Sequence, residues 1–342
     1  MEGMMRALVK TARGAGNIQL REVPIPKTGP DDVLMKVWGS AICGTDIHIY
    51  RDEYTAYEPG LILGHEFSAD VVGIGENVKN VQVGDRVISD VSTPQGTLGN
   101  DRVNGSHAEY LVMPYNQVHK LPDALSYKDG VLMEVFVACQ HGLLERMHIR
   151  PGDFALIIGS GPVGIIMLQA MKMFTPRGVM ITSLREDKIR MDMAKRYEPD
   201  YAMYADEDIL GKVMELTNGK GADVVIECSG SDEGIRLALQ AVKKGGQVNA
   251  FAVFNNDMVS ADLSLIPLKC LTVVGSWSWI GYTEEATRTT GGAVSYQRAI
   301  DIAANSKLDL AGLITHEFPL EAFEEAFAVC QEKRGVAVMF KP

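Results

Sequence analysis

The stretch Phe154-Ala-Leu-Ile-Ile-Gly-Ser-Gly-Pro-Val-Gly164 joins an apolar run of strand length to a glycine-rich turn. The segment after it, up to Met173, has the composition of a helix. Gly159, Gly161 and Gly164 stand at G-x-G-x-x-G spacing, and the order of strand, glycine turn and helix is what a dinucleotide-binding fingerprint requires. The first glycine permits the tight turn, the second lets a pyrophosphate approach the backbone, and the third lets helix and strand pack closely. The stretch therefore predicts a dinucleotide site; an ordinary glycine-rich turn is the alternative.

The sequence that follows continues with alternating strands and helical segments. Later strands are expected over Val179–Thr182, Ala222–Ile226, Gln247–Val253 and Leu271–Val274. Strands that alternate with helices are typical of a doubly wound parallel sheet, so the fold class is α/β with a Rossmann domain.

The two ends of the chain have a different texture. Residues 6–90 are short apolar runs, such as Val33–Val37 and Ala69–Val72, divided by Gly and Pro, which indicates a mainly β structure. Helices are expected over Asp129–Met147 and Val294–Ala304. We therefore predict a nucleotide-binding domain of residues 151–282 inserted into a second domain built from residues 1–150 and 283–342.

Composition excludes several function classes. The 342 residues include 33 Lys and Arg against 44 Asp and Glu, and the net charge of −11 argues against nucleic-acid binding. The apolar residues 154–174 are interrupted by Gly, Pro, Gln169 and Lys172, which favours a buried strand and helix over a membrane span. The N-terminal segment lacks the apolar region of a secretory signal. The five cysteines include no C-x-x-C pair, so we expect a cytoplasmic protein without a disulfide framework.

Three short segments before residue 150 concentrate metal-ligand side chains. They are Cys43-Gly-Thr-Asp-Ile-His48, Gly64-His-Glu66 and Met133-Glu134. A thiolate, an imidazole and a carboxylate from separate segments can form an open zinc site with one position left for water or substrate. The wide spacing between Cys43 and His65 argues against a structural zinc finger. Singly, each residue has an ordinary structural explanation, and only the combination with a nucleotide fold predicts a catalytic centre.

These motifs together resemble the zinc-containing medium-chain dehydrogenases, and most of all their sorbitol, polyol and threonine dehydrogenase branch. The resemblance spans nearly the whole chain. Its marks are Ile42–His48, Gly64–Glu66, Val83-Gly-Asp-Arg-Val87, His107-Ala-Glu-Tyr110, Met133-Glu134, Gly159–Gly164 and Glu227-Cys-Ser-Gly230. The resemblance implies a GroES-like catalytic domain beside the Rossmann domain, and a homodimer or homotetramer.

The resemblance also assigns roles to residues. Cys43, His65 and Glu66 would be ligands of one catalytic Zn²⁺, while Glu134 would be a ligand or would hold the zinc-bound water. Thr45 and His48 match the family's proton relay, in which the substrate proton passes to a cofactor ribose and then to the imidazole. The cofactor-binding positions implied by the matching motifs are Gly159, Gly161, Pro162, Val163, Gly164, Cys228 and Ser229.

The implied reaction is hydride transfer between a secondary alcohol, such as a polyol, or its ketone and a nicotinamide cofactor. Zinc acts as a Lewis acid on the substrate oxygen, and the cofactor supplies the redox chemistry. We expect the substrate pocket to draw on Ile49–Tyr57, Leu98–Val103 and Trp277–Ile280.

Two departures from the family pattern refine these expectations. Relatives carry four closely spaced cysteines that bind a structural zinc, but residues 88–106 contain none, so we predict one metal per chain. NAD-dependent relatives place an Asp 24 residues after the first fingerprint glycine, and here that position is Ser183, with Arg185 and Lys188 following. A hydroxyl and a guanidinium can bind a 2′-phosphate that a carboxylate would repel, which favours NADP(H) over NAD(H). The alternative is that Glu186 or Asp187 reaches the ribose.

Two other functions deserve comparison. A zinc-free NADPH-dependent reductase of activated double bonds would lack the Cys and His-Glu ligands that this chain retains. A catalytically silent nucleotide-binding protein would have no need of Thr45 and His48. Bound metal and activity at 340 nm with a polyol panel distinguish the three possibilities.

Overall fold

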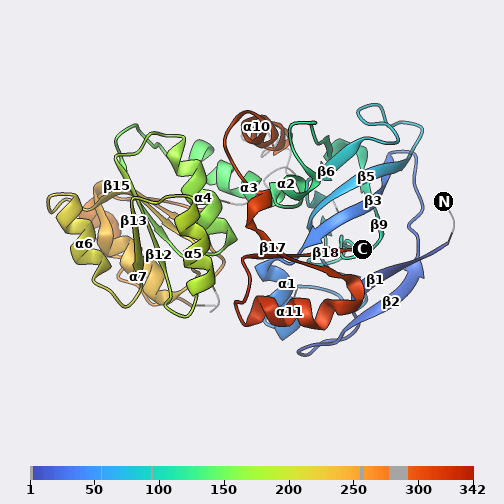
Figure 1. The fold of residues 1–342 in the computed structure, drawn as a ribbon, viewed down its shortest axis with the longest axis horizontal. Coiled ribbons are helices and arrows are strands. Elements are labelled where there is room, and N and C mark those ends of the chain that lie inside the picture. Colours follow the sequence, from blue (N-terminus) through green and yellow to red (C-terminus); the bar gives the residue numbers. More distant parts are fainter. Residues whose placement is uncertain (1–2, 55, 94, 255–257, 277–291) are drawn as a thin grey trace. The chain divides into compact units, whose positions relative to one another are not determined.

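The structure is a computed structural model that describes residues 3–54, 56–93, 95–254, 258–276 and 292–342 (Figure 1). The chain divides into two compact units, one of residues 1–137 with 278–342 and the other of residues 138–277. The boundaries of these units differ from the expected domain boundaries at 150/151 and 282/283, which stay a prediction.

The second unit is built around a six-stranded parallel sheet with the order β13-β12-β11-β14-β15-β16. Its strands are β11 (Phe154–Ile158), β12 (Gly178–Ser183), β13 (Tyr201–Tyr204), β14 (Ala222–Glu227), β15 (Val242–Ala250) and β16 (Thr272–Val274). Its helices are α4 (Pro162–Lys172), α5 (Lys188–Arg196), α6 (Ile209–Leu216), α7 (Asp232–Ala241) and α8 (Leu265–Lys269). Figure 1 shows α4 and α5 on one face of the sheet and α6 and α7 on the other. This arrangement confirms the predicted doubly wound fold.

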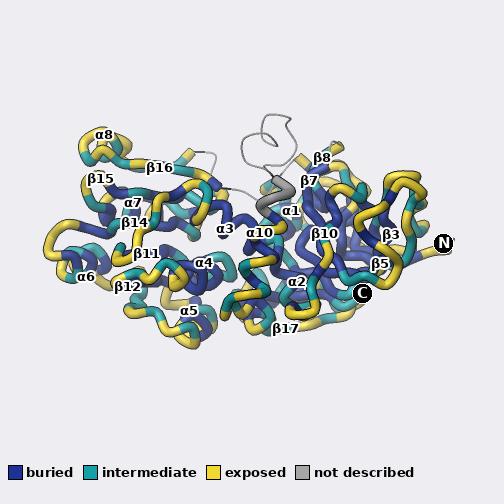
Figure 2. The backbone as a smooth tube through the Cα atoms, turned by 90° about the horizontal axis from the view of Figure 1, so that it is seen from above, coloured by how far each residue is buried: buried dark blue, intermediate teal, exposed yellow. Residues whose placement is uncertain are grey.

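Buried apolar strands explain why this sheet forms. All five residues of β11 are buried, as Figure 2 shows for the centre of the sheet. Strands covered by helices on both faces have no polar face, so they read as continuous apolar runs instead of alternating ones. Fully burying one such aliphatic side chain contributes roughly 1.5–3 kcal/mol.

The first unit contains a seven-stranded sheet with the path β10-β6-β5-β3-β18-β17, in which β9 also pairs with β3. A second sheet has the order β2-β1-β4, and β7 pairs with β8. The strands are β1 (Met4–Lys10), β2 (Ile18–Pro24), β3 (Asp32–Ala41), β4 (Leu61–Ile62), β5 (Glu66–Ile74), β6 (Arg86–Ser89), β7 (Ser92–Thr93), β8 (Gly96–Thr97), β9 (Tyr110–Pro114), β10 (Val118–Lys120), β17 (Ile314–Pro319) and β18 (Ala337–Lys341). Its helices include α1 (Gly44–Arg51), α2 (Tyr127–Val131), α10 (Gly292–Asn305) and α11 (Phe323–Gln331).

Two helix boundaries differ from the sequence prediction. α4 begins at Pro162, before the Ile165 that the apolar pattern suggested, because proline suits the first position of a helix. The single helix expected over Asp129–Met147 is instead α2, α3 (Met133–Gln140) and a π-helical turn over His141–Glu145. Leu144, in the π-helical turn, is 41% exposed.

The predicted metal-ligand segments meet because of strand register. β3 and β5 are antiparallel neighbours, and Ala41 near the end of β3 lies opposite Glu66 at the start of β5. Cys43 therefore follows one strand at the edge where His65 and Glu66 enter the other. The sheet brings the two segments together although they are distant in sequence.

Candidate metal centre and nucleotide site

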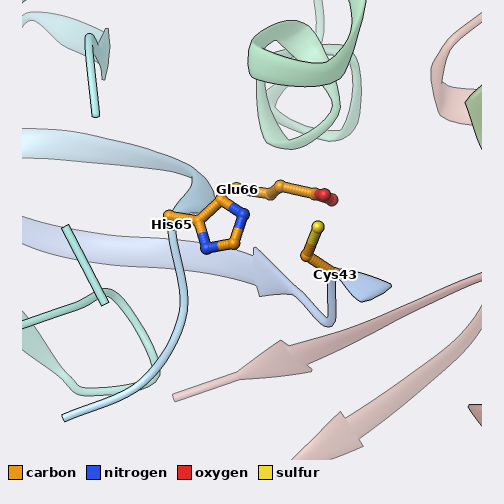
Figure 3. A group of neighbouring side chains, drawn as sticks. All are labelled: Cys43, His65 and Glu66. Atoms are coloured by element: carbon orange, nitrogen blue, oxygen red, sulfur yellow. The ribbon is translucent and has the colours of Figure 1, made fainter. Parts of the chain in front are cut away.

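The side chains of Cys43, His65 and Glu66 form a compact cluster (Figure 3). One potential ligand atom from each lies within 4.8 Å of the others. His65 and Glu66 are each only 5% exposed, while Cys43 as a whole residue has intermediate exposure. A sulfur, a nitrogen and an oxygen donor converging in this way suit a zinc ion with an open fourth position.

The electrostatics of the cluster also favour a cation. Burial, together with the charges of Asp46 and Glu134, raises the pKa of the Cys43 thiol to about 11. Burial and the neighbouring Cys43 raise the pKa of Glu66 well above its usual value. Within the described residues, Nδ1 of buried His65 has no hydrogen-bond partner. A divalent cation would stabilise both anions and give the imidazole a partner, so the residues present fit a metal.

The backbone before His65 requires glycine. Gly64 has φ +91°, and a Cβ there would come within 2.3 Å of the His107 ring. Positive φ is readily adopted only by glycine, and here there is no room for a side chain either. This residue fixes the direction from which His65 and Glu66 enter the cluster.

Asp46 ties the two ligand-bearing segments together. Its Oδ2 accepts a hydrogen bond from the Cys43 amide at 2.9 Å, and its Oδ1 accepts one from the Gly64 amide at 3.2 Å. Burial alone would raise the pKa of Asp46, but the His107 imidazole outweighs burial, with help from His65 and the Cys43 amide, so the pKa lies below its usual range. An ionised carboxylate therefore bridges both loops.

Of the remaining predicted catalytic residues, Glu134 and Thr45 lie beside this cluster, and His48 contacts Glu53. Glu134, in the first turn of α3, is close enough for its charge to raise the pKa of Cys43 and of Glu66, but it is not one of the three clustered ligands. Thr45 Oγ1 lies 3.9 Å from the Cys43 sulfur. His48 Nδ1 lies 2.7 Å from Glu53 Oε2, and the His48 side chain is 30% exposed.

The three segments expected to line a substrate pocket differ in whether they are buried, described or beside a cavity. Ile49 and Tyr57 are both 0% exposed and pack in the core, so they contribute stability instead of pocket surface. Trp277–Ile280 lies outside the described residues. A surface cavity of about 730 Å³ is lined partly by Arg102 and Val103, but no clustered ligand lines it.

The glycine fingerprint has the geometry expected of a pyrophosphate cradle. Gly159 has φ +109°, and a Cβ on Gly164 would come within 2.0 Å of the Gly159 carbonyl oxygen. A Cβ on Gly161 would meet nothing within 4 Å, so the backbone is open to a ligand at the start of α4. Pro162 and Val163 form the first helical positions. The cradle therefore fits a dinucleotide held at a helix N-terminus.

The end of β12 carries the predicted ribose-recognition residues. Ser183 is 4% exposed, and its Oγ accepts a hydrogen bond from Ser160 at 2.5 Å. Arg185 is paired with Asp206 through Nε at 2.7 Å and Nη2 at 2.8 Å, and both side chains are 59% exposed. Lys188 pairs with Asp192.

The end of β14 adjoins the same glycine turn. A Cβ on Gly159 would lie 3.2 Å from the backbone of Cys228. Ser229 donates from its amide to the buried Glu227 at 2.7 Å. Burial raises the pKa of Cys228 well above its usual value, which argues against a reactive thiol. Cys228 and Ser229 therefore lie beside the cradle, as parallel strand ends in a doubly wound sheet should.

Sequence reasoning missed three residues that shape these sites: Asp46, His107 and Asp206. Only Asp46 had a usable signal, because an acidic residue at the third position of a helix can accept from the N-cap amide. His107 and Asp206 act through tertiary contacts that no local pattern reports.

The fold and the ligand cluster together define a zinc-binding dehydrogenase. Residues 29–123 match the alcohol dehydrogenase GroES-like domain, and residues 162–289 match the zinc-binding dehydrogenase family. The chain is 31% identical to a sorbitol dehydrogenase of Halalkalibacterium halodurans, with 99% of each chain covered. It is 30% identical to a D-arabitol-phosphate dehydrogenase of Enterococcus avium, with 100% of this chain and 98% of the relative covered.

A solved structure agrees with these matches. A Sinorhizobium meliloti protein assigned to the zinc-binding dehydrogenases and bound to NADP has a TM-score of 0.84 and 26% identity, with 99% of this chain and 100% of that chain covered. The chain belongs to the zinc-containing medium-chain dehydrogenase family. In the described part of the chain, no helix is long and apolar enough to cross a membrane.

Proposed function

We propose that this enzyme transfers hydride between a secondary alcohol, such as a polyol or related hydroxy compound, and NADP(H), with one catalytic zinc per chain. The observation that carries the proposal is the buried convergence of Cys43, His65 and Glu66 in a chain that also has a complete dinucleotide cradle. The ligand set argues against the zinc-free reductase, which has no use for it.

The chain's residues divide the work. Cys43, His65 and Glu66 would hold zinc, and Glu134 would coordinate it or hold its water. When bound, zinc supplies a Lewis acid that favours loss of the alcohol proton, and the nicotinamide supplies the hydride acceptor. The Thr45 hydroxyl, 3.9 Å from the Cys43 sulfur, would accept that proton.

His48 completes the proposed proton path. Its partial exposure allows exchange with water, and its contact with Glu53 orients the ring. An imidazole has one nitrogen that can accept a proton and one that can donate, so His48 would pass the proton on to solvent.

The preference for NADP(H) rests on charge at the end of β12. Ser183 places a hydroxyl where NAD-dependent relatives have a carboxylate, and Arg185 follows two residues later. The ion pair of Arg185 with Asp206 is exposed, and exposed pairs are worth only about 0.2–1 kcal/mol. A 2′-phosphate can therefore compete for the guanidinium.

A homodimer or homotetramer is also part of the proposal. Val273 on the edge strand β16 is 40% exposed, and Leu268 of α8 is 71% exposed. Exposed apolar side chains beside a sheet edge are typical of association sites. The cytoplasm stays the compartment that the cysteine content predicts.

A direct experiment combines metal analysis with a substrate panel. We expect about one zinc per chain and oxidation of secondary alcohols followed at 340 nm. Cys43→Ala should remove both metal and activity, whereas Cys270→Ala, at an exposed cysteine of the other unit, should change neither. Full activity after thorough chelation would refute the proposal.

A further inference from the structure

A fully buried polar network lies behind the metal-ligand cluster. Ser40, Asp46, Ser106 and His107 are each 0% exposed. His107 Nε2 lies 3.5 Å from Asp46 Oδ2, and His107 Nδ1 lies 2.8 Å from Ser40 Oγ. Ser40 Oγ lies in turn 2.7 Å from Ser106 Oγ. The short contacts from Ser106 through Ser40 to Nδ1 give the ring a defined orientation, with Nε2 toward Asp46.

Packing fixes the position of the His107 ring. Its backbone amide donates to Leu63 at 2.8 Å, and the neighbouring Ser106 amide donates to Gly64 at 2.9 Å. The ring occupies the space next to Gly64 that a Cβ would fill, and its edge contacts Phe340 with ring centroids 4.9 Å apart. The imidazole therefore has little freedom to turn away from Asp46.

Asp46 transmits this position to the ligands. Its two oxygens accept hydrogen bonds from the amides of Cys43 and Gly64. Cys43 is itself a proposed ligand, and Gly64 directly precedes the proposed ligand His65. His107 Nε2 lies 3.5 Å from Oδ2, and within the described residues this nitrogen has no hydrogen-bond partner of good geometry, so Asp46 is the polar group it faces. Without the imidazole, the buried carboxylate would lose this neighbouring ring.

We propose that His107 is a positioning residue for the metal centre: it holds Asp46 against the two ligand-bearing loops, so that Cys43, His65 and Glu66 keep the separation that zinc requires. The proposal rests on the proposed function, in that these three residues are taken to bind the metal. Residues that orient metal ligands from behind typically change metal affinity by about 10- to 100-fold when they are replaced.

The test compares three replacements of His107 that retain different parts of the imidazole. His107→Phe keeps a ring but has no nitrogen. His107→Gln can place an amide nitrogen near the position of Nε2, facing Asp46, while His107→Asn can place one near Nδ1, facing Ser40. Ser106→Ala, at the far end of the network, serves as the matched control.

Two readouts do not depend on catalytic activity. Zinc affinity is measured by competition with a chelator, and the ligand geometry is followed through the thiolate and visible absorption bands of the cobalt-substituted protein. We expect His107→Phe to lower zinc affinity about 10- to 100-fold and to alter the cobalt spectrum. His107→Gln should restore most of the affinity and the wild-type spectrum, His107→Asn should not, and Ser106→Ala should leave both unchanged.

The outcomes separate this inference from the proposed function. Equal zinc affinity and identical cobalt spectra in all variants would overturn the positioning role. A second result would also overturn it: equal losses of zinc affinity in the Gln and Asn variants, in proportion to the loss of thermal stability of the metal-free proteins. Packing alone would then explain the losses. If His107→Phe fails to fold, the comparison of Gln with Asn decides. A wild-type protein that binds neither metal through a thiolate would instead overturn the proposed function itself.

Discussion

Replacing Arg185 with Ala tests the cofactor preference most directly. In the structure the guanidinium is paired with Asp206, so binding a 2′-phosphate means exchanging one anion for another. A charge-assisted contact to phosphate is worth roughly 1.5–3 kcal/mol. Giving up an exposed ion pair costs about 0.2–1 kcal/mol. The difference is roughly 0.5–3 kcal/mol, which corresponds to about a two- to hundredfold loss in kcat/KM for NADPH.

The partner of this arginine gives the opposite prediction. Asp206→Asn removes the competing charge while leaving Arg185 in place, so kcat/KM for NADPH should rise by up to about fivefold. NADH has no 2′-phosphate, and its kcat/KM should stay nearly constant in both variants. Ser183→Asp should reverse the preference, since a carboxylate there repels the phosphate and accepts from the ribose hydroxyl.

The measurement is kcat/KM for NADPH and NADH in the wild type and these three variants. A wild-type enzyme that prefers NADH would refute the reasoning. An Arg185→Ala variant that loses activity equally with both cofactors would do the same, because the side chain would then act on the fold or on a part common to both.

Further predictions concern the metal, the proton path and acid stability. Metal analysis of the purified enzyme should find one zinc per chain, not two, and a second tightly held zinc would contradict the assignment. Thr45→Ala should lower kcat strongly while zinc and cofactor still bind, whereas His48→Ala should be milder and should shift the pH profile; unchanged kcat in both would require another proton route. Burial lowers the pKa of His119 to about 4, so its contribution to stability is present above its unfolded pKa of about 6.5 and is lost as the pH falls through about 4. His119→Phe should keep the ring stacking on Tyr296, whose ring centroid is 4.9 Å away. In metal-free protein, the decrease in unfolding free energy between pH 7 and pH 4.5 should be smaller in this variant by at most about 3 kcal/mol, measured by urea unfolding. An acid loss as large as that of the wild type would count against burial as the cause.

The sheet around β11 was predictable because its signals are local. Apolar runs bounded by glycine marked β11, β12 and β14, and the glycine spacing marked the turn before α4. β13 was missed, because Tyr201–Tyr204 is short and only half-buried at the edge of the sheet, so it lacks the continuous apolar run of the inner strands.

The members of the ligand cluster could be predicted from the sequence, but the residues that hold them in position could not. Residue chemistry and resemblance together named Cys43, His65 and Glu66. No pattern of spacing could show that His107 lies behind them, since that contact depends on the backbone pairing of residues 106 and 107 with residues 63 and 64. The pairing of Arg185 with Asp206 likewise required knowing that β12 and β13 are neighbours.

The register of β3 against β5 has a consequence for how this enzyme can diversify. The proposed metal ligands lie at the ends of two paired strands, while the chain between them, from α1 to β4, leaves that sheet and returns. Loop-closure entropy rises only slowly with length, so insertions in that excursion cost little while the paired strand ends stay in place. The excursion also carries Ile49 and Tyr57, whose burial in the core anchors it to the rest of the unit. Exposed positions of the excursion, such as Glu58 and Gly60, can therefore change by insertion or replacement, while the paired strand ends and the buried Asp46 that links them stay in place.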